Sequence, residues 1–268
     1  MTDTVGWGRV FTFESVGDSD VGQVRKINED SLLLAPGSRL WVVADGMGGH
    51  AAGDFASQTL VASLDTIGVP ASYEDLRHRM ADRLTQANHR VQMHAAELGR
   101  GAIGSTLVAL VAIEDRFLCY WSGDSRLYLL RAGGLCQVSR DHTEVQSLLD
   151  AGRISEDEAA NWPRKNVITR AIGVTPTLEV EMVEGQLQDR DLFLLCSDGL
   201  LEYFDDDELA HVLKLPDWGL EQKCKYLVAQ AVERGGKDNV SVVLVQARDF
   251  GLREVDVDGQ FPEFEGLL

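Results

Sequence analysis

The sequence lacks the features of a membrane, exported or disulfide-bonded protein. Its apolar runs, such as LVALVAI at residues 107–113, are far shorter than the ~20 residues that a membrane-spanning helix needs. No basic stretch followed by an apolar core stands near residue 1, so we expect no export signal. The four cysteines are scattered without a C-x-x-C pair, which favours reduced packing residues over a zinc or redox site. We therefore expect a cytoplasmic protein that does not contact a membrane.

Positive charge is also scarce. The chain has 25 Lys and Arg residues against 43 Asp and Glu residues, a formal net charge of −18. Nucleic acid is therefore an unsuitable partner, because its phosphates require a basic surface. An acidic chain suits cationic partners, or a carboxylate-rich site whose charge divalent metals neutralise, and acidity also promotes solubility.

No repeat, low-complexity tract or linker divides the chain, which predicts one domain over residues 1–248 and an acidic tail over residues 249–268. Apolar residues recur at helical spacing over residues 76–98, and shorter helices are expected at 55–64 and 220–234. Between them lie short β-branched runs, and RFLCYWSGDSRLYLL resembles two strands around a hairpin turn. Strands outnumber helices, so we expect antiparallel sheets covered by helices, an α+β fold.

Residues 144–166 differ from the rest of the chain because they are polar and helical in short pieces. Ser155 and Glu158 have the spacing of a capping box, and Trp162-Pro163 stands near the end of the segment. We interpret this segment as an excursion from the sheets and a candidate lid.

Six carboxylates are candidates for one site. Asp45 and Asp198 each follow an apolar run and precede a glycine, which lets the backbone approach a ligand closely. A carboxylate at the end of a buried strand is costly unless its charge is offset. The full set is Glu29, Asp30, Asp45, Asp124, Asp198 and Asp238.

Oxygen ligands without cysteine or histidine partners select Mg²⁺ or Mn²⁺ over zinc or copper. Several carboxylates suit a pair of such ions, which can share one hydroxide and stabilise an in-line phosphoryl transfer. Arg25 precedes the acidic pair at residues 29–30, and a guanidinium can bind two oxygens of a phosphate.

Eight segments, in order, resemble the metal-dependent protein phosphatases, the type 2C serine/threonine phosphatases, and especially their short bacterial members. They are SDVGQVRKINEDS, VVADGMGGHAAGDFAS, GSTLVAL, WSGDSRLYLLR, VSRDHT, NVITRAIG, LLCSDGL and GGKDNVSVVLV, and together they cover about residues 15–246. The resemblance implies a β-sandwich of two antiparallel sheets flanked by helices, in α-β-β-α layers. The metal centre would occupy a cleft at one end, with a small helical flap at about residues 144–166.

The resemblance also implies roles for individual residues. Asp45 would bridge two Mn²⁺ or Mg²⁺ ions with help from the Gly46 carbonyl, and Asp198 and Asp238 would bind one of these ions. Glu29 and Asp30 match acids that hold metal-bound water or lie beside it. Asp124 matches a residue that holds a third, weaker ion. Arg25 matches the phosphate-binding arginine, and Asn166 would lie near the third site.

The implied reaction is hydrolysis of phosphoserine and phosphothreonine in proteins by a hydroxide that the two metals activate, without a phosphoenzyme. The general acid is open, because Met47 stands where many eukaryotic relatives have a histidine. His50 or a metal-bound water could supply that proton. The expected partners are phosphorylated proteins that include a serine/threonine kinase or its substrates, in signalling or in control of a secretion machine.

Four other functions fit less well. A cysteine phosphatase needs a C-x5-R loop, but Arg126 follows Cys119 one residue too late. The D-x-D-G at residues 256–259 has no apolar strand before it, as an aspartyl-phosphate hydrolase would require. The G-x-G-x-x-A spacing that starts at Gly46 would place the Asp45 charge beside a dinucleotide pyrophosphate. A non-enzymatic binding module is disfavoured because every matched metal position is acidic.

Overall fold

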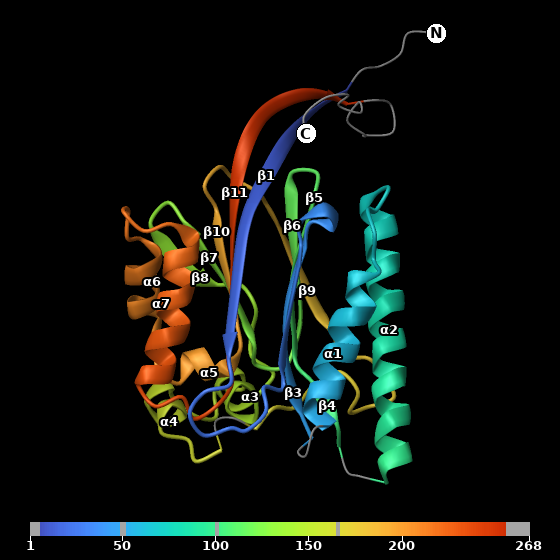
Figure 1. The fold of residues 1–268 in the computed structure, drawn as a ribbon, viewed down its shortest axis with the longest axis vertical. Coiled ribbons are helices and arrows are strands. Elements are labelled where there is room, and N and C mark those ends of the chain that lie inside the picture. The colour runs from blue at the N-terminus through green and yellow to red at the C-terminus, as the bar shows by residue number, and fades with distance from the viewer. Residues whose placement is uncertain (1–5, 49–51, 100–101, 165–166, 256–268) are drawn as a thin grey trace.

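The structure is a computed structural model that describes residues 6–48, 52–99, 102–164 and 167–255. Two antiparallel sheets pack face to face, and helices cover both outer faces (Figure 1). The first sheet, in spatial order, is β1 (Gly6–Asp20), β11 (Val240–Val255), β10 (Leu192–Cys196), β7 (Arg126–Arg131) and β8 (Gly134–Gln137). The second is β2 (Asp30–Ala35), β3 (Leu40–Met47), β5 (Leu107–Ile113), β6 (Arg116–Ser122) and β9 (Glu181–Gln186), and β4 (Gly104–Ser105) pairs with β3.

The helices complete the four layers that the family resemblance implied. The second sheet is covered by α1 (Ala52–Asp65) and α2 (Tyr73–Leu98), and the first by α6 (Asp206–Leu213) and α7 (Leu220–Glu233). A 3₁₀ turn, η1 (Pro36–Ser38), joins β2 to β3. The short helices α3 (Glu144–Asp150), α4 (Glu156–Ala160) and α5 (Asp198–Leu201) lie together at one end of the sandwich (Figure 1).

The central strands are apolar on both sides because each one contributes to two cores. Along β3, Trp41 and Val43 face the core between the sheets, whereas Leu40, Val42 and Ala44 face the core under α1 and α2. Successive side chains of a strand point to opposite faces. A strand covered on both faces therefore reads as a continuous apolar run.

The helix predictions are confirmed, with small changes at the ends. The long helix begins at Tyr73, where the Ser72 hydroxyl accepts a hydrogen bond from the Asp75 N–H (3.2 Å), and it ends at Leu98 before Gly99 in the left-handed conformation. The capping box of Ser155 and Glu158 is present at the start of α4. Two short helices therefore occupy the segment predicted as an excursion.

The predicted hairpin at residues 116–130 is wrong. Its two strands belong to different sheets: β6 pairs with the preceding β5 and with β9, and β7 pairs with the following β8 and with β10. The link turns at Gly123, whose φ of +108° strains any other residue, and a Cβ there would lie 2.7 Å from the Thr106 side chain. The turn thus carries the chain from one sheet to the other, with Asp124 between them.

Strand β11 passes the domain boundary predicted at residue 248 and continues to Val255, because β1 pairs with it as far back as Gly6. This pair extends beyond the body of the sandwich (Figure 1). The rest of the predicted tail, residues 256–268, lies outside the described residues. Among the helices that the structure describes, none is long and apolar enough to span a membrane.

Candidate metal centre

The predicted acidic residues converge at the end of the sandwich where α5 lies. A cavity of about 250 Å³ is lined by residues from both sheets and their connections. Its lining includes Arg25, Glu29, Asp45, Gly46, Asp124, Asp198 and Asp238. Asp30 lies directly opposite Asp45 in the pairing of β2 with β3 and is buried. The strands thus place all six predicted carboxylates in or beside one cavity.

Backbone hydrogen bonds hold the Asp45–Gly46 corner. The Asp45 N–H donates to the Thr106 hydroxyl (3.0 Å), and the Thr106 N–H donates to the Asp45 carbonyl (2.8 Å). The Gly46 N–H donates to the Glu29 carbonyl (3.1 Å). A Cβ on Gly46 would lie 2.1 Å from the Gly53 carbonyl oxygen, so only glycine fits this approach. The corner is fixed by its main chain, which leaves the Asp45 carboxylate available to the cavity.

Arg25, the predicted phosphate-binding residue, stands at the rim of the cavity. Its guanidinium Nη2 lies 2.6 Å from Asp238 Oδ2, and its side chain is 48% exposed. An arginine so placed can bind an incoming phosphate while it remains beside the acidic centre.

The buried carboxylates raise one another's pKa. Burial, then the charge of Asp30 among others, raises the pKa of Asp45 well above its usual value. Burial raises the pKa of Asp124 to about 8 and that of Asp198 to about 6, with added repulsion from neighbouring carboxylates. Burial also raises the pKa of Asp30 to about 7, although the neighbouring hydroxyls of Ser241 and Ser197 oppose the shift. Bound cations would relieve this repulsion.

The donor set suits hard divalent cations. Asp30 Oδ1 and Asp198 Oδ1 are buried and have no hydrogen-bond partner, although buried carboxylate oxygens normally have one. All the donors are oxygens, the type that Mg²⁺ and Mn²⁺ prefer. Within the described residues, no three acidic, histidine or cysteine side chains are arranged to hold one ion as they stand. Coordination would require Asp238 to exchange its contact with Arg25 for a cation.

Comparison with known sequences decides the family. Residues 25–240 match the family described as protein phosphatase 2C. The chain belongs to this family. It is 38% identical over 236 residues to the serine/threonine protein phosphatase PstP of Mycobacterium tuberculosis. The matched region covers 87% of this chain but only 44% of the length of PstP. It is 35% identical over 237 residues to the serine/threonine phosphatase stp of Listeria welshimeri, with 85% of the chain and 93% of stp covered.

The fold of this chain is also similar to that of solved structures. PppA, described as a key regulatory component of T6SS in Pseudomonas aeruginosa, superimposes with a TM-score of 0.80 at 42% identity, covering 91% of this chain and 100% of PppA. The catalytic domain of PstP in complex with two manganese ions gives a TM-score of 0.80 at 34% identity, and the match covers 90% of this chain and 100% of the PstP domain. This chain therefore carries a protein phosphatase 2C domain, and it is similar to PstP and stp, both named serine/threonine phosphatases.

Two polar residues that hold the acidic side of this cavity were not predicted. Ser197 donates to Asp30 Oδ2 (2.9 Å) and accepts from the Ser241 N–H (3.0 Å). Asn239 accepts from the Glu29 N–H (2.8 Å) and donates to the Val21 carbonyl (2.9 Å). Ser197 and Asn239 adjoin the predicted ligands Asp198 and Asp238 in the sequence, a proximity that could have indicated them.

Two predicted site residues lie outside the described residues. His50, one candidate for the general acid, and Asn166, predicted near the third ion, both fall in gaps of the described chain. Met47 lines the cavity but carries a thioether, which cannot donate a proton. The roles of these residues stay predictions.

Proposed function

We propose that this domain hydrolyses phosphoserine and phosphothreonine in proteins with a pair of divalent cations, Mn²⁺ or Mg²⁺, and that it opposes a serine/threonine kinase. The observation that carries the proposal is the cavity shared by five of the six predicted carboxylates, with Arg25 at its rim. The two unpartnered oxygens of Asp30 and Asp198 support it, because a bound cation would satisfy them.

The residues that would hold the pair of cations are Asp45, the Gly46 carbonyl, Glu29, Asp30, Asp198 and Asp238, and Asp124 would hold a third. When bound, such cations supply Lewis-acid activation of water and neutralise phosphate charge. Arg25 binds the phosphate oxygens and orients the phosphoester over the acidic centre. The fixed corner at Asp45 keeps its carboxylate in place without reorganisation during the reaction. His50 or a water supplies the proton to the leaving alcohol.

The names of the relatives support the proposed partners. PstP and stp are serine/threonine phosphatases, and PppA is described as regulating T6SS. We propose that this chain likewise acts on phosphorylated proteins, either in kinase signalling or in control of a secretion machine. All four cysteines are free of disulfides, which supports the proposed location in the reducing cytoplasm.

The test is phosphate release from a phosphothreonine peptide by the purified chain in Mn²⁺, Mg²⁺ or EDTA. We expect release only with a divalent cation, and loss of release in Asp45→Ala and Asp198→Ala. Asp65→Ala, at the exposed end of α1, is the matched control and should keep full activity. Circular dichroism checks that each variant is folded. Full activity in EDTA, or in both site variants, would refute the proposal.

A further inference from the structure

A groove leads away from the metal-centre cavity beneath α3 and α4. A second cavity of about 250 Å³ shares Asp124 and Asp198 with the first and is lined by residues of α3, α4 and α5. A third hollow, of about 940 Å³, shares Arg126, Leu149 and Glu202 with the second. Shared lining residues make the three hollows adjoin. We call the second and third hollows the flap groove.

The flap groove is an acidic channel with apolar side chains along it. Leu149, Leu201 and Phe204 contribute the apolar surface. Its acidic residues are Asp124, Asp141, Glu156, Asp198, Glu202, Asp205 and Asp206. Lysine and arginine side chains combine an apolar stem with a cationic end, so they match such a surface.

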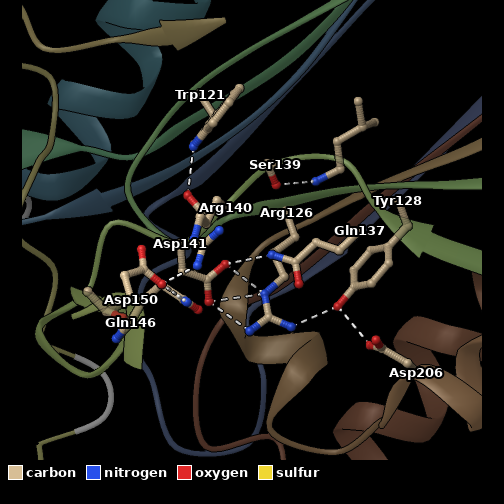
Figure 2. Close-up of polar contacts among 12 residues, drawn as sticks. Trp121, Arg126, Tyr128, Gln137, Ser139, Arg140, Asp141, Gln146, Asp150 and Asp206 are labelled. Carbon is tan, nitrogen blue, oxygen red and sulfur yellow. Dashed lines mark hydrogen bonds and ion pairs between the residues drawn. The ribbon is translucent and has the colours of Figure 1, made fainter. Parts of the chain in front are cut away.

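The cationic groups near the groove do not neutralise it. Arg126 lines the groove, but Asp141 holds its guanidinium at 2.7 and 2.8 Å, and Tyr128 occupies another nitrogen (Figure 2). Lys237 pairs with Glu202. Glu156, Asp205 and Asp206 have no cation at ion-pair distance in the part of the chain that the structure describes. Negative charge therefore remains available to an occupant.

The inner end of the groove holds a carboxylate that lacks an outside partner. Asp124 is 8% exposed and lines both the groove and the metal-centre cavity. Among the described residues, only its own backbone N–H donates to it, and Arg126, whose charge attracts it, is already bound to Asp141. A buried carboxylate without a partner is costly, so this position favours a cationic group. It marks the junction where an occupant of the groove would reach the reacting phosphate.

We propose that the flap groove binds the substrate polypeptide on one side of the phosphorylated residue and selects basic side chains there. The proposal rests on the phosphatase function proposed above and adds the substrate class to it. A substrate whose phosphate lies beside Arg25 has its chain directed into the adjoining hollow. The carboxylates at Glu156, Asp205 and Asp206 then attract its lysine or arginine residues, and the overall negative charge favours the same partners.

The test compares phosphothreonine peptides that differ only in flanking charge. One peptide carries two lysines before the phosphothreonine, one carries them after it, and one has glutamines instead. With Mn²⁺, we expect one of the lysine peptides to have a higher kcat/KM than the glutamine peptide. The advantage should shrink as salt rises from 0.05 to 0.5 M, since salt screens exposed charges.

Two neighbouring residues of α6 provide a matched pair of variants. Asp206 and Asp207 both lie exposed in the first turn, but only Asp206 lines the groove. Asp206→Asn and Glu156→Gln should each reduce the lysine advantage by about two- to five-fold, the effect of one exposed ion pair. Asp207→Asn should leave it unchanged.

Equal hydrolysis of all three peptides would overturn the groove proposal while leaving the phosphatase function intact. A lysine advantage that survives in both groove variants would overturn it too. Failure to hydrolyse any peptide in Mn²⁺ would instead refute the proposed function.

Discussion

Asp141→Asn should destabilise the protein strongly, because Asp141 is the anion of a partly buried ion pair. Its carboxylate accepts from Arg126 Nε at 2.8 and 3.1 Å and from Nη2 at 2.7 Å, and the two side chains are 11% and 27% exposed (Figure 2). Asparagine keeps the shape but removes the charge. The Arg126 guanidinium would then be left partly buried without a counter-charge.

The size of the effect follows from the exposure of the pair. Removing one partner of a fully buried ion pair costs about 3–5 kcal/mol. Because Arg126 is partly exposed and keeps its bond to Tyr128 (2.8 Å), we expect the lower end, about 3 kcal/mol. In a domain of this size that loss lowers the melting temperature by roughly 6–12 °C.

The assay is urea unfolding followed by circular dichroism in EDTA, so that metal binding does not contribute to the free energy. The matched control is Asp150→Asn, which breaks the exposed pair between Asp150 and Arg140 in the same region (Figure 2). Exposed pairs contribute under about 1 kcal/mol. If Asp141→Asn costs no more than Asp150→Asn, the reasoning from burial is refuted.

Three further predictions concern the metal centre. In EDTA the melting temperature should fall as pH rises from about 5 to 8. The buried aspartates have raised pKa values in the folded chain, whereas aspartates of the unfolded chain titrate near about 3.9. The folded chain therefore binds protons more tightly than the unfolded chain, and low pH favours folding. The stabilisation by these protonated aspartates is present at low pH and is lost through pH 6–8. A melting temperature in EDTA that does not change with pH would contradict this reasoning. Mn²⁺ should remove the decrease in melting temperature. Gly46→Ala should weaken Mn²⁺ binding, measured by calorimetry, by at least about ten-fold. The alanine Cβ would lie 2.1 Å from the Gly53 carbonyl oxygen and would displace the Asp45–Gly46 corner. An unchanged Mn²⁺ affinity would count against a fixed main chain at this corner. Arg25→Ala should lower kcat/KM for a phosphopeptide by about 10- to 100-fold, the value of charged hydrogen bonds. It should not weaken Mn²⁺ binding, because it frees Asp238 from its contact with Arg25; an unchanged kcat/KM would exclude phosphate binding by Arg25.

The candidate ligands could be found from the sequence because their positions carry local signals. Asp45 and Asp198 each follow a strand-length apolar run and precede a glycine, and the structure places each where its run ends. Asp238 comes directly before the run that forms β11. The helical spacing of apolar residues also predicted the covering helices, since each helix buries one apolar stripe against a sheet.

The partners of the strands could not be predicted in the same way. A turn at residues 122–125 looks the same in sequence whether it closes a hairpin or links two sheets. Which one forms depends on the strands that β6 and β7 pair with instead, the preceding strand β5 and the distant strands β9 and β10. The support that Ser197 gives to Asp30 is equally non-local, because the two residues are far apart in the sequence.

The link between the sheets connects the metal centre to the flap groove. The Gly123 N–H donates to His142 Nδ1 (3.2 Å), and the His142 N–H donates to the Gly123 carbonyl (2.9 Å). The other ring nitrogen, Nε2, lies 3.3 Å from Glu181 Oε1 and 3.3 Å from Arg170 Nη1. The His142 carbonyl accepts from the Thr169 N–H (2.7 Å), just beyond the segment of α3 and α4. The turn that carries Asp124 is thus bonded to the base of the segment that lines the groove. Displacement of that base would disturb the turn that carries Asp124, so the proposed substrate selection in the groove and the position of this carboxylate would depend on the same hydrogen bonds.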